Sequence, residues 1–116
     1  MITPQQIIDG MADKNRMLTQ KNDEYIELSE KRAENERSFS KAFARKMIEL
    51  KIEGQSVTLI EKIAKGDDVV ADMKYALDVS EGVCKACLNS IKAVTTQIDS
   101  YRSLLAWQKA ELLRTE

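Results

Sequence analysis

The chain has 116 residues, which is enough for one domain with a core of its own. Hydrophobic residues make up 43% and charged residues 32%, which argues against disorder, while four glycines and one proline provide too few turns for a β-sandwich or barrel. The formal net charge is −1 and histidine is absent, so charge indicates no particular partner, and the usual general base, zinc ligand and activator of nucleophiles are missing. The composition therefore favours an all-α fold.

A first helix is predicted from about residue 4 to about residue 53. Thr3 and Gln6 have the spacing of a capping box, and Pro4 suits the first helical position. Gly10 predicts a bend or break, but residues 11–52 contain no further glycine or proline. We therefore expect a helix that continues for about 60 Å at a rise of about 1.5 Å per residue.

This helix has only a weak apolar stripe. The stripe consists of Met11, Leu18, Tyr25, Leu28, Phe39, Phe43, Met47 and Leu50. Lys21, Arg32 and Asn35 fall where the stripe should continue. Two interpretations remain open: their stems lie along a partner helix, or their polar groups set the register of a helical assembly.

A short connecting helix is predicted over about residues 57–65. Gly54 can end the first long helix, and Gly66 can end the connector. Ser56 or Thr58 can cap the connector at its start. A connection this short predicts that the two long helices are antiparallel neighbours.

The third predicted helix runs from about residue 68 to about residue 114, with Asp67 or Asp68 as its cap. Its seam has steps of three and four residues and consists of Val70, Met73, Leu77, Ser80, Cys84, Cys87, Ile91, Val94, Ile98, Tyr101, Leu105, Gln108 and Leu112. Eleven of these thirteen side chains are apolar, and a period of 3.5 residues is typical of a helix that packs on other helices along its length. Gly82 within this helix predicts either a close helix approach or a bend.

We expect residues 1–116 to form a single domain, a long antiparallel, coiled-coil-like helical hairpin. Two long helices cannot enclose a core alone, and Val69, Ala76 and Val83 add apolar surface beside the seam. We therefore predict a homodimer or higher oligomer, assembled as a helical bundle. The predicted oligomer interface consists of Leu77, Cys84, Cys87, Ile91, Val94, Ile98 and Leu105.

The connector region also carries a recognisable pattern. Residues 57–60 read Val-Thr-Leu-Ile, residues 64–67 read Ala-Lys-Gly-Asp, and Val70, Ala71 and Leu77 follow. The pattern resembles T-L-I…A-R-G-D…V-A…L in a group of small helical proteins of phages and prophages of Gram-positive bacteria, with Lys65 in place of the usual arginine. The resemblance covers most of the chain from about Tyr25 onward. It implies a phage origin and a bacterial cytoplasm, and many members are encoded near replication and recombination genes. It supplies no active site.

The two cysteines, Cys84 and Cys87, are three residues apart and lie on one helix face. Free cysteines that act as small buried hydrophobes are the expected role. A zinc site would need two chains to pool their cysteines, and a redox motif would need a helix N-terminus. Trp107 is expected as a packing or dimer anchor, with an exposed partner-binding role as the alternative.

Basic residues gather near the turn. Arg37, Lys41 and Arg45 follow an i, i+4, i+8 spacing, and Lys46 adjoins them. These four residues predict either a stripe that contacts phosphates or a solvated face whose bases pair with the acids at residues 67–81.

These observations predict a non-enzymatic accessory protein of a phage, without catalytic residues, metal or cofactor. Its expected partners are further copies of itself and a host or phage protein, which it binds through helical faces. The alternative is a nucleic-acid-binding accessory factor of phage replication or recombination that uses the basic turn end. No apolar run reaches about 18 residues and no signal peptide is visible, so we expect no membrane partner and a location in the bacterial cytoplasm.

Overall fold

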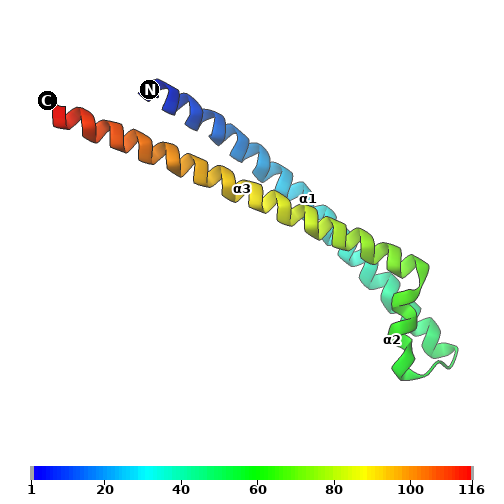
Figure 1. The fold of residues 1–116 in the computed structure, drawn as a ribbon. Helices are drawn as coiled ribbons and strands as arrows, with labels where there is room; N and C mark the ends of the chain where they lie inside the picture. Colours follow the sequence, from blue (N-terminus) through cyan, green and yellow to red (C-terminus); the bar gives the residue numbers. More distant parts are fainter. Residues whose placement is uncertain (1, 116) are drawn as a thin grey trace. The chain divides into compact units, whose positions relative to one another are not determined.

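A computed structural model describes residues 2–115 of the chain. It contains three helices, α1 (Pro4–Ile52), α2 (Val57–Gly66) and α3 (Asp68–Thr115), and no strand in the described residues (Figure 1). The all-α prediction is confirmed. Each helix end lies within one residue of its predicted position.

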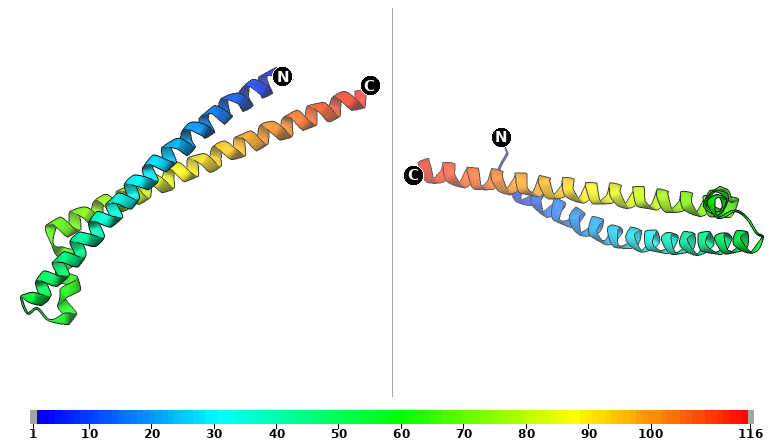
Figure 2. Two further views of the ribbon diagram at one scale, coloured as in Figure 1. Left: turned by 180° about the vertical axis from the view of Figure 1, so that it is seen from behind. Right: turned by 90° about the horizontal axis from the view of Figure 1, so that it is seen from below.

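The chain groups into two units, which we describe separately. The terminal unit comprises Met1–Ile26 and Ala86–Glu116, and the turn unit comprises Glu27–Lys85. Within the terminal unit, the first part of α1 (blue) runs beside the last part of α3 (orange to red) in the opposite direction (Figure 2). The turn unit contains α2 and the segments of α1 and α3 that α2 connects.

Three interactions fix the antiparallel pairing in the terminal unit. The Gln108 side-chain nitrogen donates a hydrogen bond to the Ile2 carbonyl oxygen at 2.7 Å. The Tyr101 ring lies over Gly10, and the Cys87 thiol lies 3.5 Å from the Lys21 carbonyl oxygen. The positions on α3 fall as those at the N-terminus and on α1 rise, so the two segments run in opposite directions.

The helix ends follow from local sequence. Thr3 and Gln6 form the predicted capping box, in which each side chain accepts a hydrogen bond from the other residue's backbone N–H. At the other end of α1, Gly54 has a φ of 84°, and its N–H donates to the Lys51 carbonyl, while the N–H of Gln55 donates to Leu50. This pair of bonds is a Schellman motif, which explains why a glycine ends α1.

Of the caps predicted for the other two helices, one is absent and one is present. Ser56 directly precedes α2 but makes no capping hydrogen bond through its side chain, and Thr58 lies inside the helix. The proposed cap at Thr58 is therefore wrong. Asp67 accepts a hydrogen bond from the Val70 N–H at 3.2 Å and so caps α3.

The seam of α3 is confirmed by burial. Every seam position from Val70 to Gln108 is buried or half-buried, and only Leu112 is exposed. Burying an aliphatic side chain such as Val94 or Ile98 contributes about 1.5–3 kcal/mol, so this row supplies much of the stability of the fold. A smaller core of Leu50, Ile60 and Ala64 holds α2 against α1 in the turn unit, with Phe43 and Met47 packed beside it.

Burial within one chain changes the predicted oligomer interface. Leu77, Cys84, Cys87, Val94 and Ile98 are buried in the single chain, and Ile91 and Leu105 are half-buried. The sequence predicts contacts between copies for these side chains, because two helices alone cannot enclose a core. Within one chain, α1 therefore covers five of the seven residues, and the predicted contact of these residues with a second copy stays a prediction.

The sequence predicts a bend or break at Gly10 and a close helix approach or a bend at Gly82, but the structure places the close approach at Gly10. Helix α1 continues through Gly10 without a break, and a Cβ there would lie 2.7 Å from Cζ of Tyr101. A Cβ at Gly82 would meet nothing within 4 Å. The close approach therefore belongs to Gly10, while Gly82 only weakens its helix.

The two glycines give a matched prediction. We expect Gly82→Ala to raise the free energy of unfolding by about 1 kcal/mol, which is the gain in helix propensity. Gly10→Ala has the same gain, but the displaced Tyr101 ring costs about 1–3 kcal/mol, so we expect a net loss of stability. Urea denaturation of both variants measures the difference, and an equal gain in both would contradict the Gly10–Tyr101 contact.

Candidate interaction surfaces

The four predicted basic residues do not form one uniform stripe. Arg37, Lys41 and Arg45 are exposed, and none of them forms an ion pair with another residue in the described part of the chain. Lys46 is half-buried and lies 3.4 Å from a carboxylate oxygen of Glu49. Of the four basic residues, only Lys46 is therefore paired with acidic residues, as the second interpretation expects.

Lys46 also joins two helices of the turn unit. Its ammonium group lies 3.6 Å from a carboxylate oxygen of Asp67, the residue that caps α3. The hydrogen bond to Glu49, together with the charges of Glu49 and Asp67, raises the pKa of Lys46 above its usual value against the opposing effect of burial. Lys46 thus has a structural role, and the exposed stripe is reduced to Arg37, Lys41 and Arg45.

The aromatic residues near this stripe are engaged in packing. The Phe39 and Phe43 rings stack with centroids 5.7 Å apart, and the Lys74 ammonium group lies 5.5 Å from the centroid of Phe39. Both rings are half-buried: Phe39 meets α3 through Lys74, and Phe43 packs beside the small core between α1 and α2 in the turn unit.

The cysteines occupy the seam as small hydrophobic side chains. Cys84 and Cys87 are free thiols, and each is 6% exposed. The described residues contain no group of three or more histidine, cysteine, aspartate or glutamate side chains arranged to hold a metal ion. None of the helices, as far as the structure describes them, has a stretch long and apolar enough to cross a bilayer.

Polar residues of α1 lie on its seam, and the structure shows how two of them are accommodated. The Asn35 side-chain nitrogen donates a long hydrogen bond of 3.4 Å to the Ala76 carbonyl oxygen on α3. The Lys21 ammonium group turns outward to Glu24 at 3.2 Å, while its backbone carbonyl faces Cys87. Asn35 therefore supports the register interpretation, and Lys21 supports the interpretation of an aliphatic stem along the partner helix.

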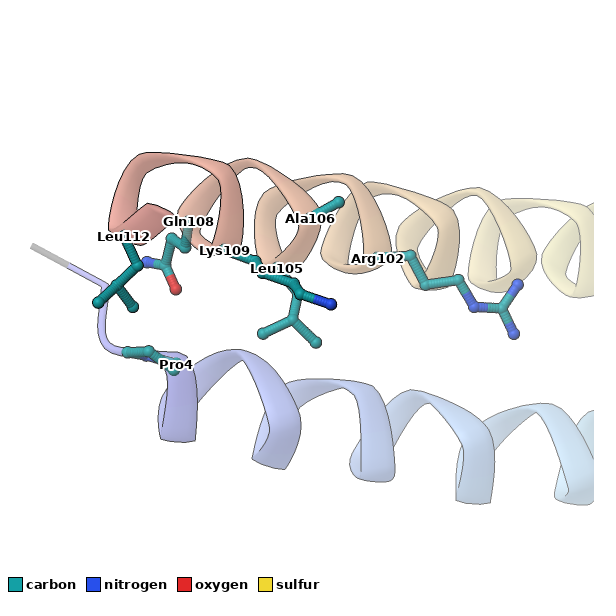
Figure 3. Close-up of a pocket in the computed structure, with 7 residues that line it drawn as sticks. All are labelled: Pro4, Arg102, Leu105, Ala106, Gln108, Lys109 and Leu112. Carbon is teal, nitrogen blue, oxygen red and sulfur yellow. The ribbon is translucent and has the colours of Figure 1, made fainter. Parts of the chain in front are cut away.

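A groove of about 400 Å³ lies in the terminal unit between the start of α1 and the end of α3 (Figure 3). It is lined by Pro4, Arg102, Leu105, Ala106, Gln108, Lys109 and Leu112. In the close-up, Leu105 points from α3 toward α1. Gln108 holds the Ile2 carbonyl through its side-chain nitrogen, and its side-chain oxygen is buried without a hydrogen bond.

Trp107 lines a neighbouring groove that shares Pro4 and Gln108 with the first, and its side chain is 64% exposed. With Ile2 and Leu104, which are also exposed, it forms what we call the terminal apolar patch. The sequence favours a packing or dimer anchor for Trp107, and with about two thirds of its side chain exposed it is not a residue of the core among the described residues. The alternative role, an exposed partner-binding residue, fits its position better.

A second groove, of about 370 Å³, lies in the turn unit. Leu28, Lys31 and Asn35 line it from α1. From α3 it is lined by Tyr75, Ala76, Val79, Ser80 and Val83. Sequence reasoning noted Ala76 and Val83 beside the seam but missed Tyr75 and Val79. For Val79 the missed signal is a series one position before the seam, which includes Val69, Ala76 and Val83, whereas Tyr75 lies outside this series and had no such signal.

No family model, curated protein or solved structure matches the chain. The similarity to phage proteins therefore stays a prediction. The function must be argued from the surfaces that the fold presents.

Proposed function

We propose that this chain is a non-enzymatic accessory protein of a phage or prophage that acts in the bacterial cytoplasm. In this proposal the antiparallel helices form one long hairpin, copies of the hairpin assemble into a helical bundle, and an exposed helical face binds a host or phage protein. The connector pattern around residues 57–77 supports the origin, and the absence of histidine from the sequence supports a role without catalysis.

The terminal apolar patch is the observation that carries the proposal. When a partner covers exposed tryptophan and leucine side chains, apolar surface is removed from water, which favours binding. Tryptophan is also enriched among the residues that contribute most of the binding energy. Trp107 and Leu104 are exposed on α3, and Arg102 and Lys109 line the adjacent groove. This combination suits an amphipathic segment of a partner protein with acidic flanks.

Affinity capture from a bacterial lysate tests this proposal. We expect the wild-type chain to retain a specific protein after nuclease treatment, and Trp107→Ala to reduce its affinity at least about 30-fold, because loss of a hot-spot tryptophan costs about 2 kcal/mol or more. Ile52→Ala is the control, because this residue is similarly exposed but lies at the far end of α1. Failure of the wild-type chain to retain any protein specifically contradicts the proposal.

Binding of nucleic acid is the second candidate function. It is favoured by Arg37, Lys41 and Arg45, which are exposed, lie on one face of α1 and form no ion pair among the described residues. Three bases in a row along a helix can contact successive phosphates, and such contacts weaken steeply with added salt.

A gel-shift assay separates the two candidates. If the stripe binds DNA or RNA, changing Arg37, Lys41 and Arg45 together to glutamate should abolish the shift. The equivalent change of Lys85, Lys92 and Lys109, which are exposed on α3, should weaken the shift far less. Undiminished binding after the first triple change rejects the nucleic-acid function, and the protein-binding proposal expects no shift at all.

A further inference from the structure

One face of α1 in the turn unit combines exposed basic and exposed apolar side chains. At 3.6 residues per turn, a sector of about 80° around the helix contains Arg37, Lys41, Arg45, Ile48 and Ile52. All five are exposed, Ile48 by 60% and Ile52 by 80%. This set, which we call the outer face of α1, extends for about 22 Å along the helix.

The outer face points away from the other helices of the turn unit. Leu50, which is 4% exposed and belongs to the small core with α2, lies about 180° around α1 from the middle of this face. Phe39, whose ring meets Lys74 of α3, lies about 160° from it. Neither α2 nor α3 therefore covers the outer face, and a broad, flat partner can approach it.

The apolar end of this face continues across the turn onto α2. Val57, the first residue of α2, is 84% exposed and lines one groove with Ile48 and Lys51. Val57 and Ile52 are the two most exposed large apolar side chains of the described residues. They lie on either side of the turn at Gly54, so three aliphatic side chains gather at a protruding end of the turn unit (Figure 1).

Basic side chains flank this apolar end. Around α1, Arg45 lies about 60° to one side of Ile48, and Lys51 lies about 60° to the other side. Both bases are exposed, and neither they nor Arg37 and Lys41 form an ion pair within the described residues. Four free positive charges therefore surround the aliphatic side chains, an arrangement typical of protein surfaces that lie on anionic lipids.

The acids near the outer face limit its extent. Glu30 and Glu34 lie in the same sector, about two turns and one turn before its first base. Glu49 lies beside the face, about 80° from its middle, and pairs with Lys46 at 3.4 Å, while Glu53 follows the last residue of α1. The face is therefore acidic first and then basic and apolar, so an anionic surface would meet its turn end.

We propose that the outer face of α1, together with Val57, docks on an anionic lipid surface. The bases meet the headgroups, and the side chains of Ile48, Ile52 and Val57 enter the boundary between headgroups and acyl chains, about 5–10 Å deep. This contact needs no stretch that crosses the bilayer, so the proposal departs from the sequence-based expectation of no membrane partner. It is independent of protein capture through Trp107, which lies in the other unit.

The three aliphatic side chains favour lipid over nucleic acid as the occupant of this face. A nucleic-acid backbone would pair with the bases through its phosphates, but it offers no apolar surface to Ile48, Ile52 and Val57. A fluid bilayer offers both anionic groups and acyl chains, and it accepts a protruding apolar end without a preformed cavity.

Sedimentation of the full chain with lipid vesicles tests the proposal. We expect binding to vesicles of equal parts phosphatidylglycerol and phosphatidylcholine to be at least about tenfold tighter than to phosphatidylcholine alone, because four bases face the headgroups. Ile48→Ser together with Ile52→Ser should weaken this binding at least about tenfold. Ile8→Ser together with Ile26→Ser is the matched control, because both isoleucines are exposed on α1 outside the face. Circular dichroism verifies that both variants keep their helices.

The charges have a test of their own. Lys41→Glu should weaken binding to the anionic vesicles at least about tenfold, whereas Lys31→Glu, the same change at an exposed base outside the face, should weaken it far less. A wild-type chain that ignores anionic vesicles, binds both kinds of vesicle equally, or binds them without need of the two isoleucines overturns the proposal. Binding of duplex DNA that depends on Lys41 but tolerates both serine changes, without vesicle binding, assigns the face to nucleic acid instead.

Discussion

The contact between the seam of α3 and the face of α1 is the constraint on which the rest of the structure depends. The seam repeats every 3.5 residues over most of a 48-residue helix, so it can be covered only by another helix that follows it along its length. Helix α1 provides that cover, but with a half-polar surface in which Lys21, Arg32 and Asn35 replace aliphatic residues. The core is therefore one row of side chains deep, and both long helices keep large outer faces.

The thin core explains where binding surfaces arise. Val79, Val83 and Leu104 each lie one position before a seam residue of α3. No other helix covers these side chains among the described residues, so they are exposed. Two exposed regions result, the terminal apolar patch around Trp107 and an apolar strip on α3 that consists of Val69, Ala76, Val79 and Val83. They lie in different units: the patch carries a tryptophan beside two basic residues, and the strip runs along a groove between α1 and α3 in the turn unit.

Much of the fold could be predicted because its determinants are local. The Thr3–Gln6 capping box, Gly54 at the end of α1 and the periodic seam each act within a few residues or along one helix. The errors concern contacts between helices. The sequence could not show that Tyr101 lies over Gly10, or that Gly82 has no neighbour, because both facts depend on the register of α1 against α3.

The candidate surfaces were less predictable for the same reason. The seam residues look equally apolar whether another segment of the same chain or a second copy covers them, so the sequence could not show that Leu77, Val94 and Ile98 are buried within a single chain. Among the basic residues, spacing alone could not separate Lys46 from Arg37, Lys41 and Arg45, because the pairing with Asp67 requires the turn to bring α1 and the start of α3 together.

The most direct test of the antiparallel pairing is a nuclear Overhauser measurement between the Gly10 Hα protons and the Tyr101 ring, on a sample that mixes labelled and unlabelled chains. The structure predicts strong cross-peaks within one chain, because a carbon atom placed on Gly10 would lie 2.7 Å from that ring. Absence of these cross-peaks, or their appearance only between different chains, would show that α1 does not cover the seam of its own α3 and would contradict the fold on which both surfaces depend.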